Sequence, residues 1–590
     1  MFASLLIANR GEIAVRIAAT ARALGIRTIA VFSEADSNAL HVRVADDARC
    51  IGSAPPRHSY LDIEAIVRAA VDSGADAVHP GYGFLSENAD FARAVEAAGL
   101  TFVGPDPRTI EQMSDKVAAR AAAIASGVPV LAGSEGAVAD PAQARGLADE
   151  IGYPIAVKAC FGGGGRGMRV AADPDSLEAA MAAAGREAEA AFGRGDVFLE
   201  AFLRRPRHVE VQILGDNHGN VVHLHDRDCT VQRRHQKMIE EAPAPQLDPP
   251  VREAMLDAAV SLCRSIGYRG AGTVEYLFDA EHGAFYFLEM NTRLQVEHGV
   301  TERVTGIDLV EAQLAIAAGE RLPFAQQDVQ VRGHAIEARI AAEDPWADFA
   351  PGPGRVDRLD LPLTPWTRLD FGVEVGDTVQ PHYDSMMGKL IAWGIDRDSA
   401  RIRLQQGLRS LRVEGVPSTA PYLEKLVEQP EFIAVRHFTG SAESEWPASR
   451  FARPEPEPHD REQQPVMAET ISERIVCLGG RGRAVAVYGV AGTALPIAVA
   501  SGRAARGTSA DATGPAAAGA GNLIYSPMDA VLVQTPVGIG SSIAEGETLV
   551  ILEAMKMEVA VAAPRSGTVV RIEGRPGASV RKGQLLAELA

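Results

Sequence analysis

The sequence predicts an α/β protein followed by a small all-β module, and three observations support this fold class. Residues 3–33 have the apolar pattern of a strand, a helix and a second strand. Residues 273–278 and 285–297 resemble two neighbouring strands in which polar and apolar residues alternate. Residues 521–590 contain a repeat with an offset of 37 residues, which predicts two similar sheets with glycine turns.

Composition and charge limit the possible functions. At 590 residues the chain is long enough for about three to five domains. A net charge of -19 opposes binding to nucleic acid or to an anionic membrane, and no segment approaches about 18 uninterrupted apolar residues. The five cysteines form no Cys-x-x-Cys pair, which argues against a disulfide framework and a zinc knuckle. The short apolar run at residues 5–8 has no basic segment before it and is typical of a strand, so we expect a cytoplasmic protein.

The N-terminal segment predicts a strand at 4–8, a helix at 13–24 and a strand at 28–32. No G-x-G-x-x-G motif follows the first strand, so a structural α/β half is favoured over a dinucleotide site. Residues 79–88 are rich in turn-forming residues and predict a loop.

A possible phosphate site follows a buried-looking strand at 154–159 that carries Lys158. The glycine loop 162–167 comes directly after it and leaves backbone N–H groups free to approach phosphate oxygens. The lysine precedes the glycines, which is the wrong order for a Walker A loop, and four glycines alone are more often a flexible turn.

Residues 207–224 predict a hairpin on which His223 and His225 share one strand face. No third ligand stands at a suitable spacing, so a surface position is favoured over a metal site. The basic run 227–237 that follows ends in two acidic residues within an acidic chain, which favours small anions over nucleic acid as its ligands.

The most informative catalytic stretch is 285–297, where five polar residues occupy every second position. If this segment is one strand, those side chains share one face. Glu275 on the neighbouring strand adds a second acid, and two carboxylates with an amide oxygen suit Mg²⁺ bound to ATP phosphates. A solvent-facing strand would show the same alternation but accounts less well for Glu275. The five residues are Glu289, Asn291, Arg293, Gln295 and Glu297.

Lys556 lies between two methionines, near the join of the 37-residue repeats, where a hairpin turn would present it to solvent. Within the repeat, Gly540 corresponds to Gly577 and Leu549 to Leu586. The Ala-Met-Lys-Met sequence in such a double β-motif resembles the biotinyl domain of biotin-dependent carboxylases. That resemblance implies biotin on Lys556; the related lipoyl domain lacks the methionine pair.

Residues 1 to about 445 resemble the biotin carboxylase module, an ATP-grasp enzyme, through HPGYGFLSEN, GGGGRGM, RDCTVQRRHQK, EMNTRLQVEH and YDSMMGKL. The resemblance implies a Rossmann-like pre-ATP-grasp domain (1–113), an ATP-grasp domain (114–325, lid about 132–203) and an α+β C-terminal domain (326–445). A linker with a possible small β-element for partner docking (446–520) and a flattened β-barrel biotinyl domain (521–590) would follow.

The resemblance also implies roles for individual residues. The ATP site would comprise Lys116, Lys158, Gly164, Gly165, Glu200, Leu203, His208, Gln232, His235, Glu275 and Glu289. Glu275, Glu289 and Asn291 would hold Mg²⁺ or Mn²⁺, while Lys237, Arg293, Gln295 and Val296 would bind bicarbonate. Glu297 would be the general base, and Arg339 would bind biotin and stabilise its enolate.

These roles together imply an acyl-CoA carboxylase α-chain that uses ATP and bicarbonate to carboxylate the biotin on its own C-terminal domain. We expect a biotin protein ligase to modify it, and a separate carboxyltransferase β-subunit to use the carboxybiotin on an acyl-CoA, in a hetero-oligomer. Acetyl-CoA and propionyl-CoA are the expected substrates. The alternatives are a component of another biotin-dependent carboxylase, such as pyruvate carboxylase, and an ATP-grasp carboxylate–amine ligase with a lipoyl-like appendage.

Overall fold

The computed structural model describes residues 1–160, 168–192, 194–455, 470–478, 481–488, 522–555 and 557–590. The chain divides into two compact units, one of residues 1–452 with 522–590 and one of residues 453–521. In the second unit, β23 (Thr470–Leu478) and β24 (Arg481–Tyr488) form an antiparallel hairpin, within the segment that we expected to contain strands. Among the described residues, no helix is both long and apolar enough to cross a membrane.

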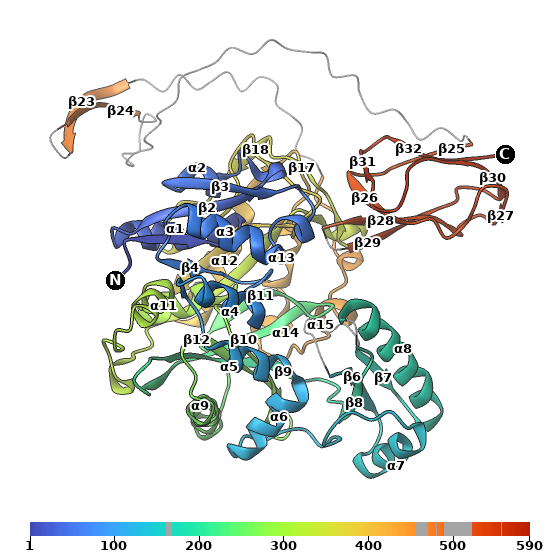
Figure 1. The fold of residues 1–590 in the computed structure, drawn as a ribbon, viewed down its shortest axis with the longest axis horizontal. Coiled ribbons are helices and arrows are strands. Elements are labelled where there is room, and N and C mark those ends of the chain that lie inside the picture. The colour runs from blue at the N-terminus through green and yellow to red at the C-terminus, as the bar shows by residue number, and fades with distance from the viewer. Residues whose placement is uncertain (161–167, 193, 456–469, 479–480, 489–521, 556) are drawn as a thin grey trace. The chain divides into compact units, whose positions relative to one another are not determined.

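The N-terminal domain, blue in Figure 1, is a five-stranded parallel sheet with the order β3-β2-β1-β4-β5. Its first strand, first helix and second strand are those predicted for residues 3–33. Helix α1 buries Ile13 and Ile17 in the same apolar cluster as Leu5 and Ile7 of β1. Its elements are β1 (Ser4–Ile7), α1 (Gly11–Ala23), β2 (Arg27–Ser33), α2 (Leu40–Val44), β3 (Asp47–Gly52), α3 (Ile63–Asp72), β4 (Ala77–His79), α4 (Ala89–Ala97), β5 (Thr101–Phe102) and α5 (Pro107–Ser114).

A small antiparallel sheet with the order β7-β6-β8 carries Lys158 on its central strand. Its apolar face packs with α7 and α8 in one cluster that includes Ile155, Val157 and Leu199 (Figure 1). The elements of this part are α6 (Lys116–Ala125), α7 (Pro141–Ile151), β6 (Ile155–Ala159), β7 (Met168–Ala171), α8 (Pro174–Phe192) and β8 (Val197–Ala201).

An eight-stranded antiparallel sheet has the order β13-β12-β9-β10-β11-β14-β21-β19 and is the largest sheet among the described residues. Strands on both sides of residue 326 belong to this sheet, because β11 pairs with β14. The strands are β9 (Arg207–Gly215), β10 (Val221–Arg233), β11 (Gln236–Ala242), β12 (Gly270–Asp279), β13 (Ala284–Asn291), β14 (His334–Ala341), β19 (Thr367–Phe371) and β21 (Met386–Gly394).

Helices and short strands surround this sheet. Helix α12 packs on β21 and β14, and its Leu404 and Leu408 join the apolar cluster of Leu390. The helices are α9 (Pro249–Ser265), α10 (His298–Thr305), α11 (Leu309–Ala317), α12 (Arg397–Ser410), α13 (Ala420–Leu426), α14 (Pro430–Ile433) and α15 (Ser441–Ser444). The short strands are β15 (Glu343–Asp344), β16 (Ala350–Pro351), β17 (Gly354–Arg355), β18 (Arg358–Asp360), β20 (Thr378–Val379) and β22 (Arg412–Glu414).

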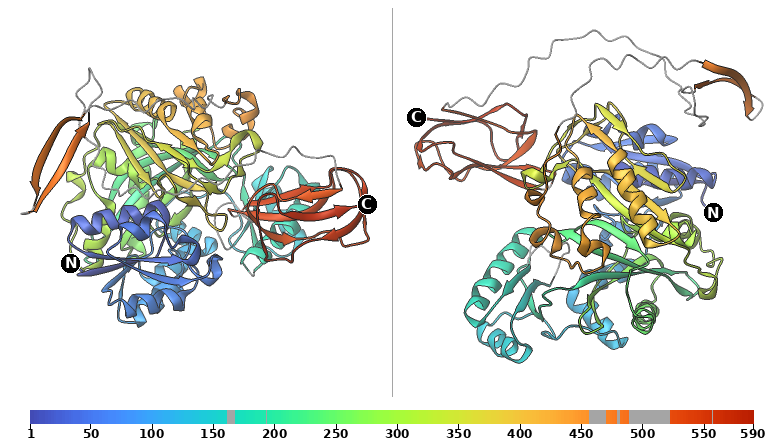
Figure 2. Two further views of the ribbon diagram at one scale, coloured as in Figure 1. Left: turned by 90° about the horizontal axis from the view of Figure 1, so that it is seen from above. Right: turned by 180° about the vertical axis from the view of Figure 1, so that it is seen from behind.

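The C-terminal module consists of two four-stranded sheets, β25-β32-β30-β27 and β29-β28-β26-β31 (Figure 2). The predicted repeat is visible in the strands, since β26, β27 and β28 lie 37 residues before β30, β31 and β32. Gly540 and Gly577 both have positive φ, 88° and 89°, at equivalent turns. The strands are β25 (Leu523–Tyr525), β26 (Ala530–Gln534), β27 (Ser542–Ile543), β28 (Thr548–Ala554), β29 (Met557–Ala562), β30 (Gly567–Ile572), β31 (Ser579–Val580) and β32 (Leu585–Leu589).

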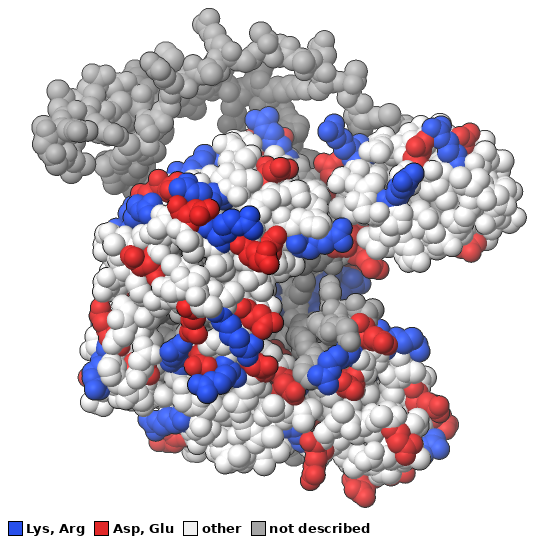
Figure 3. Space-filling model, viewed as in Figure 1, with Lys and Arg blue, Asp and Glu red and all other residues white. Residues whose placement is uncertain are grey.

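The hairpin predicted around the Met-Lys-Met sequence is present, because β28 pairs with β29 and Ala554 lies opposite Met557. Met555 has a φ of 52°, the left-handed conformation that a tight connection requires. Lys556 itself lies outside the described residues. On the face shown in Figure 3, Lys and Arg side chains alternate with Asp and Glu side chains over the described surface.

Candidate active site

The acidic pair predicted on neighbouring strands is present on β12 and β13. These strands are antiparallel, with Glu275 directly opposite Glu289 and Thr273 opposite Asn291. The single long strand predicted for residues 285–297 is wrong beyond Asn291, where the pairing with β12 ends. From there the chain turns toward α10, and Glu297 is the residue that precedes its first turn.

The polar residues of this turn nevertheless converge, through hydrogen bonds and not through a common strand face. Arg293 donates from Nη2 to Oδ1 of Asn291 at 2.9 Å and from Nη1 to Oε1 of Gln295 at 3.0 Å. Gln295 in turn donates from Nε2 to Oε1 of Glu275 at 2.9 Å. Arg293 also donates from Nε to Oε2 of Glu87 at 3.0 Å, so the loop 79–88 supports this site.

Lys237 on β11 is the central cation of the site. Its ammonium donates to Oε2 of Glu210 at 2.6 Å, to Oε1 of Glu275 at 2.8 Å and to Oε1 of Glu297 at 2.7 Å. Burial acts to lower the pKa of Lys237, but the three carboxylates outweigh it and hold the pKa well above its ordinary value. The ammonium is therefore charged and joins three acids from three different parts of the chain.

Glu297 is fully buried between two cations. Its Oε1 accepts from Lys237, and its Oε2 accepts from Nη2 of Arg339 at 2.9 Å. Burial acts to raise the pKa of Glu297, but Lys237, Arg339 and Arg227 outweigh it, so its pKa lies well below the ordinary value. The carboxylate is therefore ionised, and its two cations make it a weak proton acceptor in this arrangement.

Arg339 on β14 is held by a second acid, Glu240 on β11. Nε of Arg339 donates to Oε1 of Glu240 at 2.6 Å. Burial is the main cause that raises the pKa of Glu240 to about 7. The guanidinium thus bridges Glu240 and Glu297, which fixes its plane at the edge of the catalytic cluster.

The Glu275–Glu289 pair fits a divalent cation. Like charges on directly opposed residues destabilise a sheet, and burial, followed by the charge of Glu275, raises the pKa of Glu289. With the amide oxygen of Asn291, the two carboxylates form the hard oxygen donor set that Mg²⁺ prefers. His208 lies beside them, with Nε2 2.9 Å from Oε2 of Glu275.

The described residues predicted to contact nucleotide lie on strands, in turns and at the start of one helix. Lys158 on β6 forms an ion pair with Glu200 on β8, which also accepts from Nη1 of Arg120 at 2.9 Å. Burial lowers the pKa of Lys116, at the start of α6, and also that of His235, in the β10–β11 turn. Gln232 lies 3.4 Å from the ring of His208, and Leu203 follows β8 as a half-buried side chain. Gly164, Gly165 and Lys556 lie outside the described residues.

Several residues of the site are missing from the sequence prediction. Glu210 and Arg227 are fully buried, and Nε of Arg227 donates to Oε1 of Glu210, so part of the basic run 227–237 is an internal ion pair. The signal for Glu210 is its alternation with apolar residues between His208 and Gln212 on β9. Glu87 carries no such signal, because it lies in an irregular loop.

Comparison with known proteins identifies the family of the chain. Four family models match the chain: "Biotin carboxylase, N-terminal domain" at 1–110, "Carbamoyl-phosphate synthase L chain, ATP binding domain" at 115–325, "Biotin carboxylase C-terminal domain" at 337–443, and "Biotin-requiring enzyme" at 522–589. Biotin carboxylase of Haemophilus influenzae is 52% identical over 433 residues, 73% of this chain and 96% of that protein. The chain belongs to the biotin carboxylase family. It is an ATP-dependent biotin carboxylase that carries its own C-terminal biotin carrier domain.

Other relatives of this biotin carboxylase are components of larger carboxylases. The alpha chain of a mitochondrial methylcrotonoyl-CoA carboxylase of Oryza sativa is 50% identical over 72% of this chain and 58% of that protein. A pyruvate carboxylase subunit of Methanothermobacter thermautotrophicus is 48% identical over 73% of this chain and 88% of that protein.

Solved structures show the same fold. A Campylobacter jejuni biotin carboxylase is 44% identical with a TM-score of 0.73, covering 76% of this chain and 99% of that one. The biotin carboxylase domain of Hydrogenobacter thermophilus 2-oxoglutarate carboxylase, solved with MgADP and bicarbonate, is 43% identical with a TM-score of 0.75, covering 77% of this chain and 100% of that one.

Proposed function

We propose that this biotin carboxylase is the α-chain of an acyl-CoA carboxylase and supplies a separate carboxyltransferase β-subunit in a hetero-oligomer. The combination of a carboxylase module and a carrier on one chain supports this proposal, as does the 50% identity with the alpha chain of a methylcrotonoyl-CoA carboxylase. Acetyl-CoA and propionyl-CoA are the substrates that we propose for the partner. The five cysteines without a Cys-x-x-Cys pair support a reducing, cytoplasmic location.

The second candidate is a component of a pyruvate carboxylase. The 48% identity with the Methanothermobacter pyruvate carboxylase protein, over 88% of its length, supports it. Both candidates share the first half-reaction, so they differ only in the acceptor that the carboxyltransferase uses.

The observation that carries the site assignment is Glu297, an ionised carboxylate buried between Lys237 and Arg339. In the proposed step Glu297 takes the proton of bicarbonate, whose oxygen then attacks the γ-phosphorus of ATP, and ADP leaves. Lys237, Arg293, Gln295 and Val296 bind the bicarbonate. Because Lys237 and Arg339 pair with Glu297 in the resting site, the arrival of anionic substrate competes for these cations and makes Glu297 a stronger base.

Glu275, Glu289 and Asn291 are the residues that would hold Mg²⁺ or Mn²⁺. The ion would offset negative charge on the ATP phosphates. Lys116 and Lys158 would contact the phosphates, and Gly164 and Gly165 of the glycine loop would complete the proposed phosphate site. Glu200, Leu203, His208, Gln232 and His235 hold the rest of the nucleotide. The chain itself must also exclude water, because the carboxyphosphate formed from bicarbonate and the γ-phosphoryl group hydrolyses readily.

Biotin on Lys556, added by a biotin protein ligase, is the acceptor of the carboxyl group. Carboxyphosphate breaks down to CO₂ and phosphate, and the phosphate takes the ureido proton of biotin. Arg339 would face the biotin oxygen on which negative charge then gathers, and biotin would accept the CO₂ at its ureido nitrogen. The guanidinium is already oriented by Glu240, so it offsets the new negative charge without rearranging.

The test is avidin capture of the full chain from its native cells, followed by mass spectrometry of Lys556 and of the proteins that elute with it. The captured complex is then assayed for bicarbonate-dependent ATP cleavage in the presence of acetyl-CoA, propionyl-CoA, methylcrotonoyl-CoA or pyruvate. Carboxylation of an acyl-CoA supports the first candidate, and carboxylation of pyruvate alone supports the second. ATP cleavage that ignores bicarbonate would refute the proposed site, and a chain without biotin on Lys556 would refute the carrier assignment.

A further inference from the structure

Lys389 is a fully buried lysine that contacts the chain segment of Val296 and Glu297. None of the roles proposed above involves Lys389. It lies on β21, opposite Arg339 in the neighbouring strand β14. Its ammonium donates to the backbone carbonyl oxygen of Val296 at 2.7 Å. Val296 immediately precedes Glu297, so the bond holds the peptide group that joins the two residues.

Three acids surround the Lys389 ammonium without pairing closely with it. Oε1 of Glu12 on α1 is 3.4 Å away and Oδ2 of Asp370 on β19 is 3.9 Å away. Glu337 on β14 is fully buried, and neither of its carboxyl oxygens has a hydrogen-bond partner among the described residues. Asp370 is already bound by Arg368, with Nη2 2.7 Å from Oδ2.

These distances distinguish two possible roles for Lys389. A buried lysine that only neutralised an acid would be expected to approach a carboxylate oxygen to about 2.7–2.9 Å. In this site the shortest contact of the ammonium is the Val296 carbonyl, and the nearest carboxylate oxygen is 3.4 Å away. The ammonium is therefore directed at the backbone of the catalytic segment, and the acids keep it charged while it is buried.

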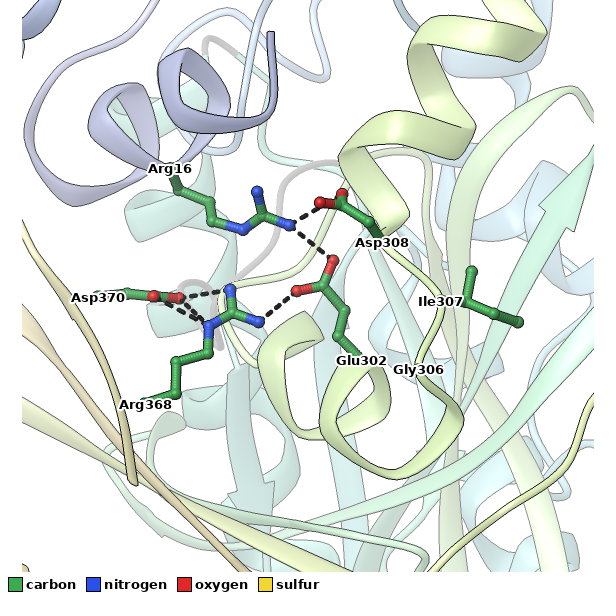
Figure 4. Close-up of a pocket in the computed structure, with 7 residues that line it drawn as sticks. All are labelled: Arg16, Glu302, Gly306, Ile307, Asp308, Arg368 and Asp370. Carbon is green, nitrogen blue, oxygen red and sulfur yellow. Dashed lines mark hydrogen bonds and ion pairs between the residues drawn. The ribbon is translucent and has the colours of Figure 1, made fainter. Parts of the chain in front are cut away.

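The other end of the same segment is also held. Helix α10 begins directly after Glu297, and its Glu302 accepts from Nη2 of Arg16 at 2.9 Å and from Nη1 of Arg368 at 2.5 Å. Figure 4 shows Arg16 and Arg368 pointing toward Glu302 in a pocket of about 380 Å³, with Asp370 on the far side of Arg368. Asp370 connects this network to Lys389. The stretch from Val296 to Glu302 is thus fixed at both ends by cations from other elements.

We propose that Lys389 is a positioning residue for the bicarbonate step, which holds the Val296–Glu297 peptide so that the Glu297 carboxylate bridges Lys237 and Arg339. The inference rests on the proposed roles of Val296 and Glu297. Without the bond, the peptide turns more freely, and Glu297 meets bicarbonate in the correct orientation less often. Nucleotide binding, which depends on other residues, is unaffected.

The test measures ATP cleavage by the full chain over a range of bicarbonate and ATP concentrations. Lys389→Met keeps the apolar stem of the side chain and removes the donor. It raises the KM for bicarbonate about tenfold and lowers kcat about tenfold, with the KM for ATP changed by less than about twofold. Lys389→Arg, which can still donate to the carbonyl, recovers most of the bicarbonate affinity. The matched control is Lys425→Met on α13, a partly exposed lysine outside the site, which changes neither KM.

The double variant Glu12→Gln/Lys389→Met separates positioning from charge neutralisation. It removes one buried acid together with the cation, so it leaves fewer unpaired buried charges than Lys389→Met alone. Bicarbonate kinetics that remain impaired in the double variant support the proposal. Normal bicarbonate kinetics in either Lys389→Met or the double variant would overturn it. If the wild-type chain itself lacked bicarbonate-dependent ATP cleavage, the proposed function would fail first, and that result is distinguishable from a failure of Lys389 alone.

Discussion

The cluster around Glu297 and the carrier module differ in the side chains that they bury. Around Glu297 the protein buries many charged side chains, and three of them, Lys237, Glu210 and Arg227, are joined by ion pairs. The core of the carrier module is apolar, and Ser526 is the single buried polar side chain among its described residues. The chemistry that we propose for the module depends on one hairpin lysine and not on a buried network of charges.

The difference shows where function and stability are separable. Burying an ion costs free energy unless its partner is present, so removal of one charge in the catalytic cluster leaves another unpaired. Reaction and stability are therefore linked there. In the carrier module we expect that the reactive residue can change without loss of packing, and that the packing can change without loss of ATP cleavage.

The largest expected effect is that of Lys556→Arg. The change removes the amine to which we assign biotin, so avidin no longer captures the chain and carboxylation of the carrier stops completely. The melting temperature of the module stays within about 1 °C, because a conservative change at a predicted surface position alters stability little. The control Lys582→Arg, on an exposed lysine of the same module, keeps avidin binding. Avidin binding that survived in Lys556→Arg would place the biotin elsewhere.

Glu297→Gln is expected to lower bicarbonate-dependent ATP cleavage by about 10²- to 10⁴-fold, the usual contribution of a general base. The amide keeps the size of the side chain but leaves Lys237 and Arg339 without one acceptor charge, so the melting temperature falls as well. Steady-state ATP cleavage and calorimetry measure the two effects. Activity within about threefold of wild type would exclude Glu297 as the base.

The repeat in the carrier module can be tested with Leu549→Ala and Leu586→Ala, two fully buried residues at equivalent positions. Each is expected to cost about 2–5 kcal/mol of module stability through the cavity that it leaves. The two costs agree within about 1 kcal/mol if the halves are packed alike. Calorimetry of the full chain measures them, and ATP cleavage with free biotin stays unchanged. A loss of ATP cleavage would show that the two regions are not separable.

The smallest expected effect is a pH dependence of folding stability. It arises from Glu12 in the N-terminal domain. Burial raises the pKa of Glu12 to about 7. The folded state therefore binds this proton more tightly than the unfolded state, and the resulting stability is present below about pH 4.5 and lost as the pH rises through about 7.

Glu12→Gln removes this titration. The free energy of unfolding of the variant minus that of wild type should be about 2 kcal/mol larger at pH 8 than at pH 5. Denaturant unfolding at several pH values measures the difference. If the difference in unfolding free energy between Glu12→Gln and wild type stayed constant across this pH range, the raised pKa of Glu12 would be contradicted.

Much of the fold is predictable from local sequence patterns. The 37-residue offset predicted the paired sheets of the carrier module because each strand and glycine turn recurs, as Gly546 and Gly583 do with φ of 83° and 77°. The alternation on β12 and β13 likewise predicted that Glu275 and Glu289 face one another. Both predictions depend on neighbours within one motif.

The convergence of the site was less predictable, because it depends on contacts between distant segments. Residues 293–297 leave the strand, and Arg293 is held by Glu87, which lies 206 residues earlier in the chain. The contact of Lys237 with Glu210 and Glu297 requires the order of strands in the eight-stranded sheet, which periodicity does not reveal. For the same reason the sequence assigned no role to Lys389, although this residue lies in the YDSMMGKL motif.

The ion pairs between α1 and the segment that contains Glu297 and Glu302 limit which N-terminal domains can be exchanged between related enzymes. Arg16 contributes one guanidinium to both Glu302 and Asp308, and Glu12 lies against Lys389 from the same helix. The N-terminal domain is therefore part of the scaffold that positions Glu297, the residue that we propose as the base. A chimera that takes this domain from a relative should retain activity only when the donor brings compatible residues at positions 12 and 16, however well the two domains fold separately.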